Sequence, residues 1–301
     1  MKHILPYAYQ HVYERAKDLG IIFYSNIDRL IYYTIASIMT RKRNIKVAAA
    51  SIMYSHTHKT MIAENYSCLE QCENDILSTF ARAYNYHYNT RGQLFDRKFG
   101  HAQKNKEKAI RQNLAYVYNN HVEKGLCKTA MENRWSLLAY ATSDHPFSNA
   151  IDTKAASRQL RRFLGVVKRH SDNNKYLTYK CLTNMIKSLC KEEQEQLIDY
   201  IVSTYRLIDF SLAICQFSSM DAMINVLDNS TGSEYDIKET YTKESDLAFC
   251  QMIHILNKTQ LLGKVYNLTN EDRERLVDYF HVYTDASDYQ ISALLHLNRT
   301  S

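Results

Sequence analysis

The chain has 301 residues, of which 45% are hydrophobic and 23% are charged. This composition is that of an ordinary globular protein and excludes a largely disordered one. On a prior of about 150 residues per domain, the length suggests two domains. Only 2 prolines and 7 glycines interrupt the chain, so long helices and strands are favoured over a many-turned β-sandwich.

The sequence has no feature that directs it into or across a membrane. No stretch reaches the roughly 20 uncharged apolar residues of a membrane-spanning helix, and the N-terminus lacks the apolar region of a signal peptide. The 7 cysteines are an odd number spread along the chain, which makes reduced thiols the default. We therefore expect a cytoplasmic protein with no membrane partner.

Positive charge is concentrated in the first half of the chain. Residues 1–150 carry 20 Lys and Arg against 12 Asp and Glu, a net of +8, whereas the remainder carries 18 against 20, a net of −2. A solvated basic face would explain this as well as nucleic acid would. The position of the charges relative to other motifs therefore has to decide.

The first half alternates between strand-like and helix-like patterns. Runs of aromatic and β-branched residues, or of alternating character, predict four strands, within 7–15, 44–54, 56–64 and 93–104. Apolar residues at helical spacing predict three helices, over 27–39, over 67–89 and after residue 105. Ser25 or Asn26 is expected to cap the first helix and Asn105 the last. The predicted order is βαββαβα.

After residue 150 the pattern changes to successive amphipathic helices. They are expected at 157–170, 179–190, 192–207 and 245–256, with a loop at 229–234. Two more helices, capped by Thr269 and Ser287, resemble a helix-turn-helix near 269–298, although helical hairpins that only pack are commoner. The sequence thus predicts an α+β fold with one domain at 1–150 and an all-helical region at 151–301.

His56 and His58 lie two residues apart in a predicted strand, so both side chains project from one face. Two imidazoles placed in this way can share one divalent ion. Such a pair also arises often by chance, so it needs a partner.

Tyr116 and Asn120 supply that partner, because residues four apart on a helix share a face. The tyrosine hydroxyl could lie near the ion while Asn120 provides an oxygen ligand. Most of the 24 tyrosines must be packing or surface residues. Tyr118 is rotated about 200° from Tyr116 on an ideal helix and should point elsewhere, so the helix face selects Tyr116.

Together these residues specify a reaction class. A divalent ion polarises the scissile phosphate, while a phenolate attacks phosphorus and becomes joined to the nucleic acid. The unperturbed pKa of tyrosine, near 10, means that the ion or a basic neighbour must assist its deprotonation.

Five segments occur in a characteristic order across about 140 residues. They are Val12-Tyr13-Glu14-Arg15, the segment 51–58 with its His-x-His ending, the Gly-x-Leu-Phe stretch at 92–99, the segment 116–126 with Tyr, Asn and Gly-Leu, and Arg134-Trp135-Ser136 followed by Tyr140. In this order they resemble the His-hydrophobic-His tyrosine transposases, especially the REP-associated tyrosine transposase group.

The resemblance implies a ferredoxin-like βαββαβα nuclease domain with Mg²⁺ or Mn²⁺ as the cofactor. It makes His56 and His58 metal ligands, Asn120 the third ligand and Tyr116 the nucleophile that forms a 5′-phosphotyrosine. The implied function is cleavage and strand transfer of single-stranded DNA, with single-stranded or hairpin DNA as the partner. Assembly as a homodimer is left open.

Three positions depart from the family pattern: Thr57 replaces a bulky apolar residue, Ser55 replaces Asn and His121 replaces Pro. Thr57 can still occupy a strand and point away from the metal. The alternative function is therefore a non-catalytic, domesticated DNA- or RNA-binding protein that retains the fold.

Basic residues near these motifs are candidates for contacts with the DNA backbone. They are Arg41, Lys42, Arg43, Lys46, Arg97, Lys98, Lys104, Lys106, Lys108 and Arg111. A solvated positive face is the alternative interpretation.

Overall fold

The computed structural model describes residues 4–17, 20–96, 99–230 and 246–297. The first half has the predicted order βαββαβα. Its elements are β1 (Tyr9–Arg15), α1 (Asn26–Lys42), β2 (Lys46–Ile52), β3 (His56–Ile62), α2 (Tyr66–Tyr88), β4 (Gly100–Lys104) and α3 (Glu107–Glu123). The strand expected within 93–104 occupies only the last 5 residues of that range.

The four strands form one antiparallel sheet in the order β2-β3-β1-β4. The register of β1 against β3 places His56 opposite Arg15 and His58 opposite Tyr13. Directly opposed residues project to the same face of a sheet. The histidine pair therefore shares a face with Tyr13, Arg15 and, by alternation along β1, His11.

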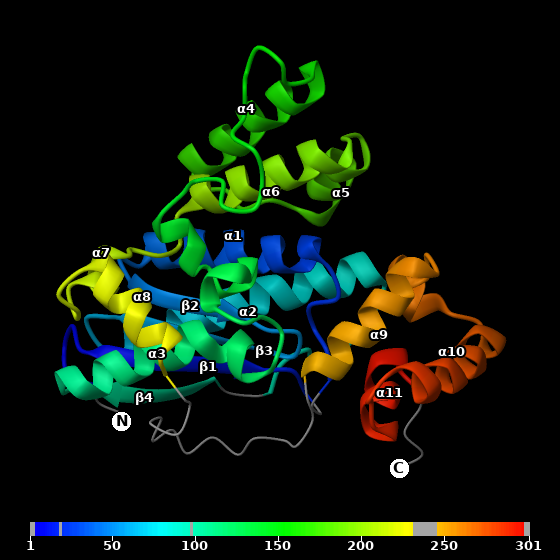
Figure 1. Cartoon of the computed structure of the whole chain (residues 1–301), viewed down its shortest axis with the longest axis horizontal. Helices are drawn as coiled ribbons and strands as arrows, with labels where there is room; N and C mark the ends of the chain where they lie inside the picture. The colour runs from blue at the N-terminus through cyan, green and yellow to red at the C-terminus, as the bar shows by residue number, and fades with distance from the viewer. Residues whose placement is uncertain (1–3, 18–19, 97–98, 231–245, 298–301) are drawn as a thin grey trace.

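Helices α1 and α2 cover one face of the sheet, and α3 covers the other (Figure 1). On the α1 and α2 face, Lys59 Nζ lies 2.5 Å from Glu14 Oε1 and 2.8 Å from Glu73 Oε2, and all three side chains are buried. Thr57 donates a hydrogen bond to Glu14 in the same network, which Tyr32 also joins. Thr57 thus points away from the two histidines that flank it. Its hydroxyl is hydrogen-bonded within this network, which explains how a polar residue is accommodated at this buried position.

Local hydrogen bonds explain where the helices begin. Ser25 accepts a bond from the backbone of Asp28 and forms a capping box with it, which confirms one of the two expected caps of α1. Asn65 caps α2 through a hydrogen bond that its side chain accepts from the backbone of Cys68. The expected cap of α3 is wrong by one residue: its N-cap is Lys106, without a side-chain bond, while Asn105 accepts a bond from the side chain of Gln103.

Asp28 also joins three helices. Its carboxylate is fully buried and accepts hydrogen bonds from the hydroxyls of Tyr88 in α2, at 2.9 Å, and Tyr179 in α5, at 2.8 Å. It accepts a further bond from the backbone of Ser25. Burial raises the pKa of Asp28, and these donors oppose the rise.

Beyond α3, the described part of the chain is all helical, as expected. The elements are η2 (Ala130–Glu132), η3 (Arg134–Ser136), η4 (Leu138–Ala141), α4 (Arg158–Asp172), α5 (Tyr179–Lys187), α6 (Lys191–Tyr205), α7 (Ser211–Ile214), α8 (Met220–Asp228), α9 (Asp246–Lys258), η5 (Leu262–Asn267), α10 (Asn270–Tyr283) and α11 (Asp288–Leu295). The loop expected at 229–234 falls mostly outside the described residues.

These later helices pack directly onto the first half of the chain. Figure 1 shows α4, α5 and α6 stacked on α1, and α9, α10 and α11 to one side of the sheet. Tyr33 of α1, for example, donates a hydrogen bond to the carbonyl of Val202 in α6. Buried apolar residues from both sides of residue 150 form one continuous cluster. The domain boundary at 150 stays a prediction.

Helices α10 and α11 form the pair that resembled a helix-turn-helix, and Thr269 and Ser287 cap them as predicted. Ile291, Leu294 and Leu295 of α11 are buried, and Tyr24 donates a bond to the Leu294 carbonyl. Residues 269–297 carry six acidic and two basic side chains. A packed helical hairpin is therefore the better interpretation of this pair.

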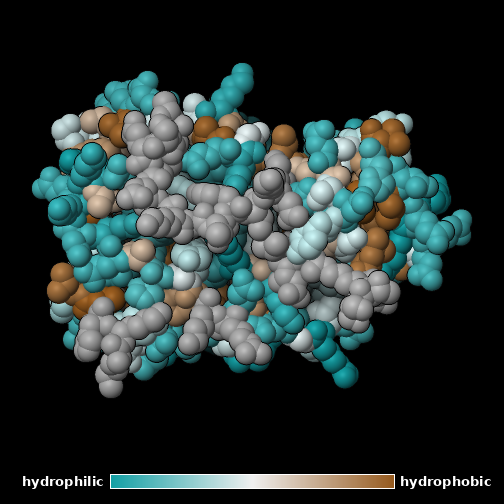
Figure 2. Space-filling view, turned by 90° about the horizontal axis from the view of Figure 1, so that it is seen from below, coloured by the Kyte–Doolittle hydropathy of each residue, from teal (hydrophilic) through white to brown (hydrophobic). Residues whose placement is uncertain are grey.

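No helix in the described ranges is long and apolar enough to cross a membrane. Seen from below, the surface is mostly hydrophilic, and its apolar residues lie in small separate groups (Figure 2).

Candidate functional site

The fold brings the two predicted clusters together. His56 and His58 of β3 have ring centroids 5.0 Å apart, and the His58 ring lies 5.1 Å from that of Tyr116 in α3. His11 of β1 completes the group, with its ring 5.5 Å from Tyr116. Tyr116 and His58 are completely buried, whereas His56 is partly exposed.

Asn120 lies one turn beyond Tyr116 and approaches His56. Its side chain acts on the His56 imidazole and opposes the lowering of that pKa. Asn120 is buried, and neither amide atom makes a hydrogen bond of regular geometry to any residue that the structure describes. Buried amides are ordinarily bonded, so this side chain has the capacity to take a further ligand.

In each of the two predicted histidine ligands, one ring nitrogen lies within hydrogen-bonding distance of a polar group. His58 Nδ1 lies 3.1 Å from His11 Nε2, and His56 Nδ1 lies 2.9 Å from the hydroxyl of Ser55. Hydrogen bonds of this kind fix the orientation of metal-binding histidines and leave the opposite ring nitrogen to act as the ligand. Nε2 is thus the nitrogen through which either imidazole would bind an ion.

The surrounding protein keeps these imidazoles neutral. Burial lowers the pKa of His11 and of His56 to about 3, and nearby Lys124 and Arg15 lower that of His56 further. The pKa of His58 is also lowered well below its ordinary value, first by burial and then by His56 and His11. Neutral imidazole is the form that binds metal ions.

The residues present fit a divalent ion with two imidazole ligands and one amide oxygen. No group of three His, Cys, Asp or Glu side chains in the described ranges is arranged to hold a metal. With His56 and His58 as two ligands, the third would be the amide oxygen of Asn120. Oxygen ligands suit Mg²⁺, and two imidazoles make Mn²⁺ at least as suitable.

Tyr118 and His121 face elsewhere. The Tyr118 hydroxyl donates to the carbonyl of Ala48 in β2 at 2.9 Å, and burial raises its pKa. Burial lowers the pKa of His121 to about 3, and the nearby backbone of Ile52 in β2 opposes this change. Of the two neighbouring tyrosines, Tyr116 is therefore the one beside the histidines.

Two predicted DNA-binding residues at the end of α1 have structural partners. Arg41 donates to the Ser171 hydroxyl at 3.2 Å and to the carbonyl of Tyr205, so it joins α1 to the later helices. Arg43 forms an ion pair with Asp75, at 2.5 Å.

Among the other predicted DNA-binding residues, Lys46 and Lys104 lie away from His56. Lys46 pairs with Ile62 and Lys104 pairs with Tyr9, which is itself opposite Ile62. His56 pairs with Arg15 at the other end of β1 and β3, so both lysines lie at the end of the sheet that is far from His56. Lys42, Lys106 and Lys108 are exposed. Arg111 forms an ion pair with Glu107 at 3.6 Å. Arg97 and Lys98 lie outside the described residues. Whether these residues contact DNA stays a prediction.

The sequence did not predict several residues near the histidines. His11, Tyr13 and Arg15 are two residues apart along β1 and so share one face of the strand. This spacing is the sequence signal that could have placed His11 and Arg15 beside the histidine pair. Lys124 is one turn beyond Asn120.

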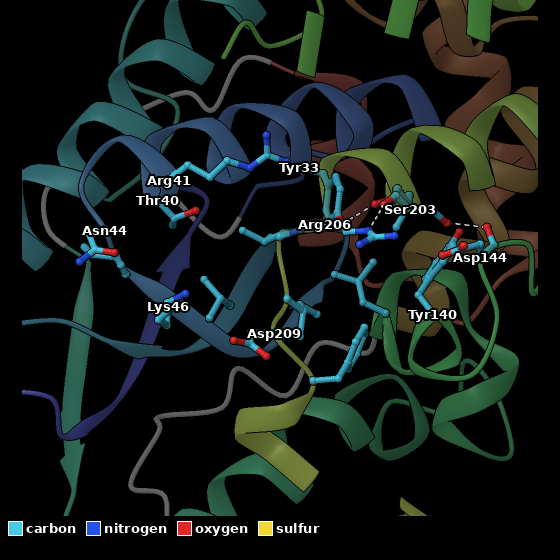
Figure 3. Close-up of a pocket in the computed structure, with 17 residues that line it drawn as sticks. Tyr33, Thr40, Arg41, Asn44, Lys46, Tyr140, Asp144, Ser203, Arg206 and Asp209 are labelled. Carbon is cyan, nitrogen blue, oxygen red and sulfur yellow. Dashed lines mark hydrogen bonds between the residues drawn. The ribbon is translucent and has the colours of Figure 1, made fainter. Parts of the chain in front are cut away.

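A pocket of about 610 Å³ lies elsewhere, between the α1–β2 turn and the end of α6 (Figure 3). Its lining contains none of the four predicted catalytic and metal-binding residues. Polar groups on its walls are bonded to one another, as the Arg206 side chain is to the Ser203 carbonyl. The pocket is therefore separate from the histidine and tyrosine cluster.

Comparison with known proteins finds one distant structural likeness. No family model and no curated protein sequence matches the chain. Among solved structures, a REP-associated tyrosine transposase bound to a REP hairpin is similar at 15% sequence identity and a TM-score of 0.40. The likeness covers 52% of this chain and 95% of the other.

Proposed function

We propose that the protein cuts and rejoins single-stranded DNA, with Tyr116 as the nucleophile. The observation that carries this proposal is the approach of Tyr116 to His58, with Asn120 beside His56, in one buried group assembled from β3 and α3. These are the four residues that the sequence pattern singled out for catalysis and metal binding.

Each residue has a defined part in the reaction. His56, His58 and Asn120 would hold Mg²⁺ or Mn²⁺, which supplies Lewis-acid polarisation of the scissile phosphate when bound. The Tyr116 oxygen, after losing its proton, attacks phosphorus and forms a bond to it while the bond to the leaving 3′-oxygen breaks and that oxygen takes up a proton. The resulting 5′-phosphotyrosine can be attacked by a 3′-hydroxyl, which permits rejoining.

Tyr116 is completely buried in the structure described here. A DNA strand can reach its hydroxyl only if the residues that cover it move aside. This burial favours the second candidate function, a DNA- or RNA-binding protein that retains the fold without cleavage.

Incubation of the full chain with hairpin and single-stranded oligonucleotides plus Mn²⁺ separates the two functions. We expect a covalent protein–DNA band on a denaturing gel, and we expect Tyr116→Phe to remove the band while DNA binding persists. Peptide mapping should place the DNA on Tyr116. Binding without any covalent product in the wild-type chain would support the non-catalytic alternative.

The DNA surface is tested separately by salt dependence. If Lys106 and Lys108 each neutralise one phosphate of a single strand, their combined replacement by Ala should reduce the slope of log K against log salt by about 1.4. An unchanged slope would remove both residues from the DNA surface.

A further inference from the structure

The second half of the chain consists of two regions of opposite charge. Residues 151–191 carry 10 Lys and Arg against 2 Asp and Glu, a net of +8, whereas residues 192–301 carry 8 against 18, a net of −10. The first region contains α4 and α5. It has the same net charge as residues 1–150 in less than a third of their number. A strongly basic segment therefore lies outside the half of the chain in which DNA contacts were predicted.

Helix α4 presents one cationic face to solvent. At 3.6 residues per turn, its five exposed cations fall within an arc of about 120° on an ideal helix. The buried residues Leu160 and Val167 lie on the opposite side of the helix. The cations on the exposed side are Arg158, Arg161, Arg162, Lys168 and Arg169.

Three of these cations have no partner within the described part of the chain. Arg161 donates a hydrogen bond to the carbonyl of Thr153 at 3.1 Å, and Lys168 forms an ion pair with Asp172 at 3.4 Å. No ion pair or hydrogen bond to a described residue engages the side chains of Arg158, Arg162 and Arg169. These three follow one line along about 16 Å of the helix axis. Their guanidinium groups are available to an external anion.

The cationic face lies on the far side of the sheet from the histidine and tyrosine cluster. Helix α4 packs on α6, which packs on α1, and Figure 1 shows α4 as the outer layer of this stack. Helix α1 covers the face of the sheet opposite to α3. A ligand on the outer side of α4 is therefore separated from Tyr116 by α6, α1 and the sheet.

The composition of this face indicates which polyanion it fits. An amphipathic helix that binds a membrane inserts apolar side chains into the lipid, and protein interfaces are anchored by aromatic and apolar residues. On α4 such residues are turned to the protein: Leu160 and Val167 are buried, and Phe163 and Leu164 pack against the core. The exposed side offers cations without an apolar anchor. Phosphate groups need only charge and donors, and the planar fork of Arg suits them.

We propose that the outer side of α4 binds the phosphate backbone of double-stranded DNA through Arg158, Arg162 and Arg169, at a second surface separate from the histidine and tyrosine cluster. The major groove of a DNA duplex admits an α-helix, whereas that of an RNA duplex is deep and narrow. This binding does not require the proposed chemistry at Tyr116. It would hold a duplex segment while a single strand occupies the other side of the sheet.

The test compares triple variants of the full chain in binding to a short blunt-ended DNA duplex over a range of salt concentrations. Each phosphate contact contributes about 0.9 to the slope of log K against log salt, so Arg158→Ala/Arg162→Ala/Arg169→Ala should reduce the slope by about 2.7. Alanine favours helix, and circular dichroism should show an unchanged fold. The three Arg→Lys changes at the same positions keep the charge and should keep the slope.

The matched control removes three exposed cations from the acidic region, in Lys258→Ala/Lys264→Ala/Arg275→Ala. It lowers the net charge of the chain by the same amount, and its slope should stay close to that of the wild type. An equal fall in both Ala variants, or an unchanged slope in the α4 variant, would overturn the inference. Tighter binding of an RNA duplex or of anionic phospholipid vesicles through these arginines would also overturn it.

The inference and the proposed function fail separately. The α4 variant should still form the covalent product with a short single strand, and Tyr116→Phe should still bind the duplex. If the wild-type chain forms no covalent product but loses duplex affinity in the α4 variant, the proposed function fails while the duplex surface on α4 stands.

Discussion

The buried Lys59 network allows a stability prediction with a magnitude. Lys59 lies between two buried carboxylates, at 2.5 Å from Glu14 and 2.8 Å from Glu73. Lys59→Met leaves both carboxylates without their cation. Breaking a buried pair in this way costs about 3 to 5 kcal/mol. At roughly 2 °C per kcal/mol for a large domain, this corresponds to a fall in Tm of about 6 to 10 °C.

The loss of stability should depend on pH with a defined sign. Burial pushes the pKa of both carboxyls up and leaves that of Glu73 raised. At Glu14 burial is the largest effect, but the charge of Lys59 and hydrogen bonds from Glu73, Lys59 and Thr57 together outweigh it and lower the pKa. Without Lys59, both values rise. A carboxyl whose pKa is higher in the folded than in the unfolded state loses stability as pH rises above the unfolded value. The variant should therefore be destabilised more at pH 7 than at pH 5.

Thermal unfolding followed by circular dichroism at the two pH values provides the measurement. Lys59→Met combined with Glu73→Gln should recover part of the lost stability, because one of the uncompensated charges is removed. A fall of less than about 2 °C at pH 7, or an equal fall at both pH values, would refute this account of the network.

Three further predictions concern the site face of the sheet. Tyr118→Phe removes the hydrogen bond to β2 and should lower the free energy of unfolding in urea by about 1 kcal/mol. The covalent DNA product should still form in this variant, and loss of the product would contradict the assignment of Tyr116 as the nucleophile. His58→Ala should abolish Mn²⁺-dependent cleavage in a gel assay while DNA binding is largely kept, and unaltered cleavage would exclude the metal site. Gly100→Ala would place Cβ 2.0 Å from the Tyr13 ring and should destabilise the protein by about 1 to 3 kcal/mol. As the control for Gly100→Ala, Gly165→Ala in α4, which has open space around it, should not reduce stability.

The parts of the fold that the sequence predicted are those with local causes. The cap at Ser25 depends on a residue three positions away, and the caps at Thr269 and Ser287 are of the same kind. The shared face of Tyr116 and Asn120 depends only on helix geometry. These features need no knowledge of distant contacts.

The parts that the sequence did not predict depend on long-range contacts. His11 reaches His58 only because β1 pairs with β3 in one register. Arg41 bonds to Ser171 and Tyr205, which are more than 100 residues away along the chain. No local pattern could have indicated either contact.

The bonds made by Asp28 bear on how the protein opens. The first amides of a helix usually exchange with solvent through fraying of its end. Here the residue that completes the capping box of α1 also holds Tyr88 and Tyr179, so unwinding the first turn would separate α2 and α5 from α1 as well. Hydrogen exchange at the start of α1 should therefore be as slow as in the core, and the ends of three helices should open as one cooperative unit.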